Sequence, residues 1–154
     1  MNNQNYCPDI NLYNIKSKFE ILLGVLLRKL VKTGSNILVN LNTLEEMNFI
    51  DRFLWTTPKE SFIPHSTETS DFNSLEKIYL HHGEYKQLKN LSSFDVLIVS
   101  PTVKIQKFLS FSKFLLFQIN HSSSNNVSHK KKLINLGFNV KTFVECDPLK
   151  WKVV

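Results

Sequence analysis

A helical pattern that ends in glycine and leads directly into an apolar strand pattern occurs twice in this chain. Ser17–Lys32 carries apolar side chains at helical spacing, Gly34 follows it, and Asn36–Asn40 has the apolar run of a buried strand. The same order recurs where a later helical pattern runs into Gly137 and a strand is predicted at Asn139–Val144. Glycine ends helices in this way because it adopts the left-handed conformation without a steric penalty. Two such helix-to-strand junctions indicate an α/β architecture.

The first helical segment has one apolar side, which we expect to pack on a sheet. That side is formed by Phe19, Leu22, Leu23, Leu26 and Leu30. Ile21 and Val25 form a second apolar patch on the otherwise charged side. Either a neighbouring helix or another chain would cover this patch, and the neighbouring helix is the favoured interpretation.

A second helix is predicted to begin at Thr43, because Glu46 follows three residues later in the spacing of a capping box. Its apolar side would be Leu44, Met47, Ile50, Phe53 and Leu54. Residues 66–74 are predicted to be a polar excursion, and Pro101 to Leu109 a short helix. Further strands are predicted at Asn11–Ile15, Leu75–Leu80, Phe94–Val99 and Lys113–Ile119, with a last helix at Ser124–Leu136.

These elements predict an α/β, three-layer Rossmann-like fold with a mostly parallel sheet flanked by helices, of about six strands and four helices. With 154 residues the chain has the size of one domain, so we expect a single domain over 1–154 with residues 1–9 as a flexible tail. Hydrophobic residues at 42% and charged residues at 21% are typical of a globular protein, not of a disordered one.

Nineteen basic against thirteen acidic side chains give a formal charge of +6, which favours acidic partners such as nucleic acid, an acidic peptide or anionic lipid. A solvated, lysine-rich surface without a partner explains the charge equally well. Cys7 and Cys146 lie far apart with no second cysteine nearby, so neither a zinc site nor a redox pair is predicted. No secretory signal and no apolar run of membrane-spanning length is present, so a cytoplasmic location is expected.

Enzyme chemistry finds little support in the sequence. No strand-to-helix turn carries the glycine-rich pattern that binds a nucleotide phosphate, and the acidic residues do not cluster as in metal-dependent phosphoryl transfer. His81 and His82 are adjacent on a predicted strand and would point to opposite faces. His65 more plausibly bonds a loop carbonyl or a partner than acts as a base, because the sequence shows no acidic orienter beside it. We therefore predict no catalytic residue, no cofactor and no metal.

The segment from Leu54 to His65 is the strongest functional signal in the chain. It reads L-W-x-x-P-x-x-S-F-x-P-H and places Trp55 and Phe62 beside Pro58 and Pro64. The prolines fix the backbone, so the aromatic side chains would be presented on a stiffened loop suited to docking. The alternative is that Trp55 packs in the core beneath its own helix.

This pattern closely resembles the signature of the chi subunit of bacterial DNA polymerase III, an accessory protein that links the clamp loader to single-stranded DNA-binding protein. Lys131 and Gly137 also keep that family's spacing, and the order of the predicted elements agrees with it. The resemblance implies a Rossmann-like fold and a partner surface for the psi subunit or for a helicase of the XPD type. Carried across, the positions of that surface are Trp55, Pro58, Phe62 and Pro64.

The resemblance also implies that the last helix receives the acidic C-terminal tail of single-stranded DNA-binding protein. The corresponding positions here are Val127, Lys130 and Lys131. The chain departs from the family at two of them. Lys130 stands where the family has an aromatic residue, and Val127 stands where the family has an arginine. We predict that Val127, Leu133 and Ile134 point inward and that Lys131, Lys132 and Asn135 form a cationic ridge. Phe138 or Phe117 is a candidate for the missing apolar slot.

The leading hypothesis from the sequence is a non-catalytic chi subunit that bridges the clamp loader, through psi or an equivalent partner, to single-stranded DNA-binding protein. Its contact with nucleic acid would be indirect, and no membrane contact is expected. The alternative is a small basic α/β protein that binds single-stranded nucleic acid through Lys130 to Lys132 and exposed aromatic residues. A nucleotide-dependent enzyme ranks below both and would bind its ligand at the carboxyl ends of the strands.

Overall fold

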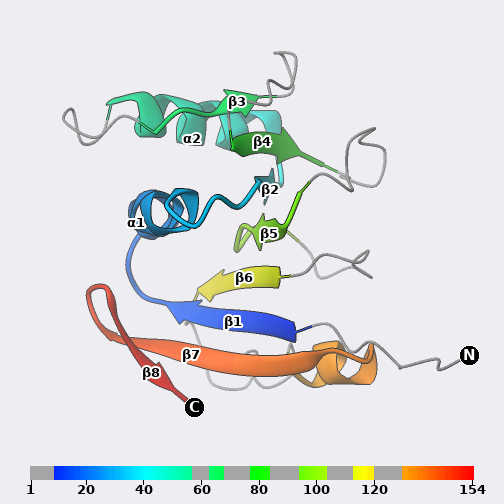
Figure 1. The fold of residues 1–154 in the computed structure, drawn as a ribbon. Helices are drawn as coiled ribbons and strands as arrows, with labels where there is room; N and C mark the ends of the chain where they lie inside the picture. Colours follow the sequence, from blue (N-terminus) through cyan, green and yellow to red (C-terminus); the bar gives the residue numbers. More distant parts are fainter. Residues whose placement is uncertain (1–8, 57–62, 68–76, 84–93, 104–112, 120–129) are drawn as a thin grey trace, which may run out of the picture.

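The computed structural model describes residues 9–56, 63–67, 77–83, 94–103, 113–119 and 130–154. Within these ranges the chain forms an α/β fold around one eight-stranded sheet (Figure 1). The elements in chain order are β1 (Asp9–Ile15), α1 (Phe19–Val31), β2 (Ile37–Leu41), α2 (Leu44–Thr56), β3 (Ser66–Thr67), β4 (Ile78–His82), β5 (Val96–Val99), β6 (Lys113–Ile119), β7 (Asn139–Asp147) and β8 (Lys150–Val153). A further helix includes residues 130–135.

The sheet confirms the predicted three-layer arrangement with mostly parallel strands. Its strand order is β3-β4-β2-β5-β6-β1-β7-β8, and the pairs from β3 to β7 are all parallel. The last strand is the exception, because β8 turns back and pairs antiparallel with β7. Neither β8 nor the two-residue strand β3 was predicted. The alternation of Lys150, Trp151, Lys152 and Val153 after a proline turn is the sequence signal that indicates β8.

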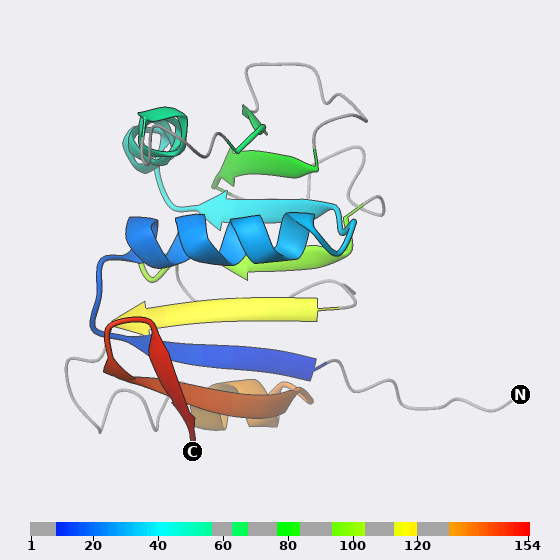
Figure 2. The same cartoon turned by 60° about the vertical axis from the view of Figure 1, so that its left-hand side comes forward.

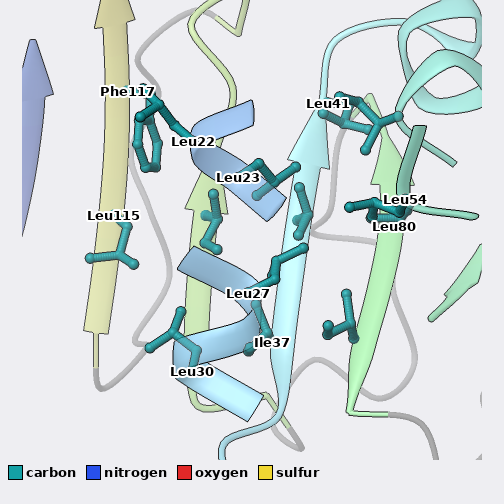
Figure 3. Packing of buried hydrophobic residues seen from close by; sticks show 14 of the residues in the cluster. Leu22, Leu23, Leu27, Leu30, Ile37, Leu41, Leu54, Leu80, Leu115 and Phe117 are labelled. Carbon is teal, nitrogen blue, oxygen red and sulfur yellow. The ribbon is translucent and has the colours of Figure 1, made fainter. Parts of the chain in front are cut away.

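Helix α1 packs its apolar side on one face of the sheet. Leu22, Leu23, Leu27 and Leu30 are buried against strand residues of that face, as Figure 3 shows. Each buried leucine contributes roughly 2 kcal/mol relative to an exposed one, so this stripe holds the helix in place. Leu27 was missing from the predicted stripe. The favoured cover of Ile21 by a neighbouring helix was also wrong, because Ile21 is exposed in the described part of the chain, and Val25 is half-buried.

Helix α2 begins as the capping pattern predicts. The backbone N–H of Glu46 donates to Thr43 Oγ1 at 3.1 Å, and the Glu46 carboxylate accepts from the backbone N–H of Asn42 at 3.0 Å. The first bond satisfies an N–H group that a helix start otherwise leaves open, and the second ties Glu46 to the residue before Thr43. Met47, Ile50 and Leu54 are buried beneath α2, whereas Leu44 and Phe49 are exposed.

Helix 130–135 packs on the second face of the sheet. Leu133 of this helix is fully buried in a separate core cluster with Phe114, Leu116 and Phe138. In Figure 2 α1 lies in front of the sheet, and helix 130–135, coloured orange, lies behind β7. The fold therefore has helices on both faces, with α1 and α2 on one side.

Both predicted glycine caps are confirmed by their backbone angles. Gly34 has a φ of 76° after α1, and Gly137 has a φ of 92° after helix 130–135. The helix predicted from Pro101 to Leu109 lies largely outside the described residues, and its first three residues form a turn. In the described part of the chain, no helix has the length and apolar character needed to cross a membrane.

Candidate functional site

Trp55 lies on the outer surface of the last turn of α2. Its side chain is 54% exposed, so it does not fill the core beneath its helix. The indole Nε1–H donates to Asp51 Oδ1, one turn earlier on α2, over 3.2 Å. A large aromatic side chain held at the surface by a hydrogen bond is a suitable anchor for a partner. The alternative of a buried Trp55 is therefore wrong.

His65 braces Trp55 from the segment that returns after the loop. Its Nε2 lies 2.7 Å from Asp51 Oδ1, its Nδ1 lies 2.7 Å from the Ile63 carbonyl oxygen, and its ring centroid lies 5.5 Å from that of Trp55. The predicted bond to a loop carbonyl is confirmed. The fold supplies an acidic partner that the sequence does not show, because it brings Asp51, fourteen residues earlier, into contact with His65.

The returning segment is fixed on both sides of Pro64. Ile63 is buried in the α1-side core and His65 is buried against Asp51, so exposed Pro64 is held between two anchored residues. We call Trp55 and Pro64, together with the bracing residues Asp51 and His65, the Trp55 surface. Two other predicted members, Pro58 and Phe62, lie outside the described residues.

The predicted cationic ridge lies on helix 130–135. Lys131 and Lys132 are exposed, Lys130 is half-buried, and Leu133 points into the core as predicted. Ile134 was predicted to point inward, which was wrong, because its side chain is 51% exposed. Val127, the remaining predicted member of this site, lies outside the described residues.

Exposed apolar side chains accompany the lysines of this helix. Ile134 and Leu136 are both about half exposed, and they lie three and four residues beyond Lys131 and Lys132 respectively, which places each beside a lysine on the helix surface. We call Lys131, Lys132, Ile134 and Leu136 the Lys131 surface. Sequence reasoning missed its apolar part because it assigned Ile134 to the core.

The two phenylalanines proposed for the apolar slot do not fill that role. Phe138 is buried and packs edge-on against Phe114, with ring centroids 5.7 Å apart. Phe117 is also buried, and it belongs to the core cluster on the opposite face of the sheet from Leu133. An apolar group that docks beside Lys131 would therefore meet Ile134 and Leu136.

The Trp55 surface and the Lys131 surface are well separated. Helix α2 packs next to β4, whereas helix 130–135 lies beside β7 on the other face of the sheet (Figure 1). Five strand-to-strand steps separate β4 from β7 in the sheet order, which corresponds to about 24 Å at the usual strand spacing. Two macromolecules could occupy these surfaces without sharing contact residues.

A cavity lies at the carboxyl ends of β1, β2, β5 and β6, where α/β proteins commonly bind ligands. Its volume is about 540 Å³, and its lining includes Lys16, Phe19, Glu46, Phe49 and Ile119. The Glu46 carboxylate accepts hydrogen bonds from the hydroxyls of Ser100 and Thr102, the latter over 2.7 Å. Nucleotide sites lie at this position in other α/β folds. A phosphate could bind here only if the polar groups of the cavity were free to contact it.

The groups that would hold a phosphate are already engaged. The backbone N–H groups of Lys16 and Ser17, in the β1-to-α1 turn, donate to Glu145 Oε2 over 2.7 Å and 2.8 Å. Glu145 also accepts from the Ser17 hydroxyl and, over 3.1 Å, from the backbone N–H of Leu149. A carboxylate thus occupies the turn that cradles a phosphate in nucleotide-binding folds. This arrangement argues against nucleotide binding at the described residues.

The other candidate groups for chemistry are two adjacent histidines and two cysteines. The His81 and His82 ring centroids are 6.2 Å apart, and His81 is buried with its Nδ1 3.4 Å from Asn40 Oδ1. Among the residues that the structure describes, no group of three or more histidine, cysteine, aspartate or glutamate side chains is arranged to hold a metal ion. Cys146 is an exposed free thiol, and Cys7 lies outside the described part.

Comparison with protein-family models gives one match that spans most of the chain. The family described as "DNA polymerase III chi subunit, HolC" matches residues 9–141. The match includes Trp55, Pro64 and Lys131 and ends within β7. A search of curated proteins found no match.

Proposed function

The chain belongs to the DNA polymerase III chi subunit family, and from this membership we propose that it is a non-catalytic adaptor that holds two replication partners at once. The observation that carries the proposal is the separation of the Trp55 surface from the Lys131 surface by the width of the sheet. An adaptor needs two surfaces that do not compete for the same partner. We further propose that one domain over residues 1–154 carries both.

The Trp55 surface would hold the partner on the clamp-loader side. Exposed Trp55 supplies a large apolar contact, and its hydrogen bond to Asp51 limits the side-chain freedom lost on binding. Pro64 lies beside it on a segment fixed by Ile63 and His65. Pro58 and Phe62 extend this surface in the proposal. The partner would be the psi subunit or a helicase of the XPD type.

The Lys131 surface would hold the C-terminal tail of single-stranded DNA-binding protein. That tail is acidic and ends in an apolar residue with a free carboxylate, so it needs cations beside an apolar contact. Lys131 and Lys132 supply the cations, and Ile134 and Leu136 supply exposed apolar area. Lys130 and Val127 complete this site in the proposal. At this surface the contact with DNA would be indirect, through the bound protein.

Reversing the charge of Lys131 tests the tail site. For the full chain titrated with a peptide ending in Asp-Asp-Ile-Pro-Phe, we expect Lys131→Glu to weaken binding about tenfold, because a charge-assisted contact becomes a repulsion. Lys18→Glu makes the same change of charge at an exposed position of the α1 start and should have little effect. Equal affinities for the wild type and Lys131→Glu would remove the tail from this surface.

The proposed role needs no active site, cofactor or metal of the chain's own. Glu145 occupies the turn that a nucleotide phosphate would need, which supports a binding role over a nucleotide-dependent one. A replication adaptor acts where the chromosome is copied, so we propose a cytoplasmic location in the bacterial cell.

Affinity capture from the native cell extract tests the function as a whole. The tagged full chain, after nuclease treatment of the extract, should enrich single-stranded DNA-binding protein together with clamp-loader subunits or a helicase, identified by mass spectrometry. Nuclease removes association through shared DNA, so joint enrichment requires contacts between proteins. Absence of both classes relative to the tag alone would contradict the proposal.

A further inference from the structure

A second cavity lies between α1 and the β7–β8 hairpin. Its volume is about 250 Å³, and its lining is apolar and aromatic apart from one lysine. The lining residues are Tyr13, Leu22, Val25, Leu26, Lys29, Phe117, Phe143, Leu149 and Trp151. Figure 2 shows the hairpin curling in front of β7 on the side of the sheet that carries α1. This cavity shares no residue with the Trp55 surface or the Lys131 surface.

Four aromatic rings form one wall of the cavity. Phe117, Tyr13 and Phe143 lie in register on β6, β1 and β7, and their rings stack with centroids 5.0 Å and 4.9 Å apart. Trp151 of β8 meets Tyr13 at 75°, with centroids 5.1 Å apart. Burial raises the pKa of Tyr13, and this outweighs a hydrogen bond with Asn11, so its phenol stays uncharged near neutral pH. The wall therefore offers neutral aromatic surface.

Two lysines flank this aromatic wall. Lys29 lines the cavity and is exposed, and Lys141 Nζ lies 5.4 Å from the centroid of the Phe143 ring. No acidic residue is among those that line the cavity. On β7, side chains alternate between the two faces, so the acidic residue nearest to Phe143 on the same face is Glu145. Its carboxylate is buried and accepts four hydrogen bonds. The site therefore suits an anionic ligand with a flat apolar part.

The cavity residues contributed by the β7–β8 hairpin lie beyond the part of the chain that matches the chi family. That match ends at residue 141, before Phe143, Leu149 and Trp151. Leu149 has a φ of 63°, a left-handed conformation that is strained for a residue with a side chain, and its N–H donates to Glu145. Glu145 thus ties the hairpin turn to the start of α1 and holds the wall in place.

We propose that this cavity binds a base of single-stranded nucleic acid, with Lys29 and Lys141 contacting the adjacent phosphates. Bases stack on aromatic side chains without base-specific hydrogen bonds, and lysines follow the phosphate backbone. An acidic peptide is the weaker fit, because the apolar lining offers a peptide backbone few hydrogen-bonding groups. The site would give the chain a direct contact with the strand that its proposed partner also covers.

Tryptophan fluorescence tests the site directly. The chain has two tryptophans, so Trp55→Phe leaves Trp151 as the reporter. Adding unlabelled oligo(dT) to this full-length variant should quench and saturate the Trp151 emission, because a stacked base quenches indole fluorescence. Unchanged emission at oligonucleotide concentrations that saturate binding by anisotropy would contradict the site. Quenching by an acidic peptide but not by oligo(dT) would also contradict it and assign the cavity to a protein partner.

Affinity measurements provide an independent test. With fluorescein-labelled oligo(dT), Trp151→Ala should weaken binding about tenfold, while Phe49→Ala, another half-exposed aromatic, should not. Lys29→Glu and Lys141→Glu should each lower the slope of log affinity against log salt by roughly 0.7, the value for one phosphate contact on a single strand, and should exceed the effect of Lys18→Glu. Circular dichroism at the assay temperature shows whether each variant is folded. Equal affinities for folded Trp151→Ala and the wild type would overturn the proposal.

Discussion

Replacing Trp55 with alanine is expected to weaken capture of the clamp-loader-side partner by about 30-fold or more, while thermal unfolding changes little. The expected loss corresponds to an interface residue worth about 2 kcal/mol, the usual size for a tryptophan at the centre of an interface. The fold should tolerate the change because the side chain is 54% exposed, and substitutions at exposed positions usually alter stability by about 0.5 kcal/mol or less. Titration calorimetry with the captured partner and a thermal melt measure the two quantities.

Phe49→Ala is the matched control for this experiment. Phe49 is on the same helix and 48% exposed, but it lines the hollow at the strand ends, away from Asp51 and His65. It should retain partner affinity. If Trp55→Ala melted far below the wild type, Trp55 would be needed for folding. If both variants bound the partner as the wild type does, the Trp55 surface would not be the docking site.

The largest effect on stability is expected at Glu145. Its Oε2 accepts from the backbone N–H groups of Lys16 and Ser17, and its Oε1 accepts from the Ser17 hydroxyl and the Leu149 N–H. In Glu145→Gln one acceptor oxygen becomes an NH₂ group. In one orientation this group points at the backbone N–H donors of Lys16 and Ser17, and in the other it points at the Leu149 N–H and at the Ser17 hydroxyl, which can turn to accept. Buried donors left without acceptors cost about 1–3 kcal/mol each. In the less costly orientation one backbone donor, the Leu149 N–H, loses its acceptor, so we expect a loss of about 2 kcal/mol in the free energy of unfolding, measured by urea titration.

The contribution of Glu145 to the free energy of unfolding should decrease at low pH. Burial by itself would raise the pKa of Glu145, but hydrogen bonds from Ser17, Lys16 and Leu149 outweigh burial and hold the pKa below its ordinary value of 4.5. A carboxylate with a lowered pKa stabilises the folded state above its unfolded pKa, and this contribution is lost as pH falls through the folded pKa. The stability difference between wild type and Glu145→Gln should therefore be constant near neutral pH and shrink below pH of about 4.5.

Glu45→Gln controls for the loss of one negative charge. Glu45 is an exposed carboxylate in the first turn of α2, and its replacement should cost about 0.5 kcal/mol or less. A similar small loss for Glu145→Gln, or a loss that does not change with pH, would show that the carboxylate does not hold the β1-to-α1 turn and the hairpin together.

Local sequence patterns were sufficient to predict most of the helices and strands and the residues that begin or end the helices. The positive φ angles of Gly34 and Gly137 and the bond between Thr43 and Glu46 depend on neighbours within a few residues, so the sequence indicates them directly. The β7–β8 hairpin was missed because its strand is short and lies after the last glycine-marked junction. Ile134 was misplaced because the phase of a helix relative to the core depends on which residues the sheet contacts.

The functional surfaces were less accessible to sequence reasoning. The choice of Trp55 and Pro64 came from the resemblance to the chi family, and their exposure follows from the structure. The contact between His65 and Asp51 forms only when the returning segment packs on α2. The hydrogen bonds from Lys16 and Ser17 to Glu145 join residues 129 and 128 positions apart, a pairing that no local pattern indicates.

Sequential binding on a surface tests the adaptor role most directly. Single-stranded DNA coated with single-stranded DNA-binding protein is immobilised, the chain is added, and the psi subunit or the captured clamp-loader-side partner follows. We predict that this partner is retained when the chain is present, that Lys131→Glu prevents loading of the chain, and that Trp55→Ala loads but does not retain the partner. Displacement of the chain from the coated DNA by the partner would mean that the two surfaces are not independent and would contradict the bridging role.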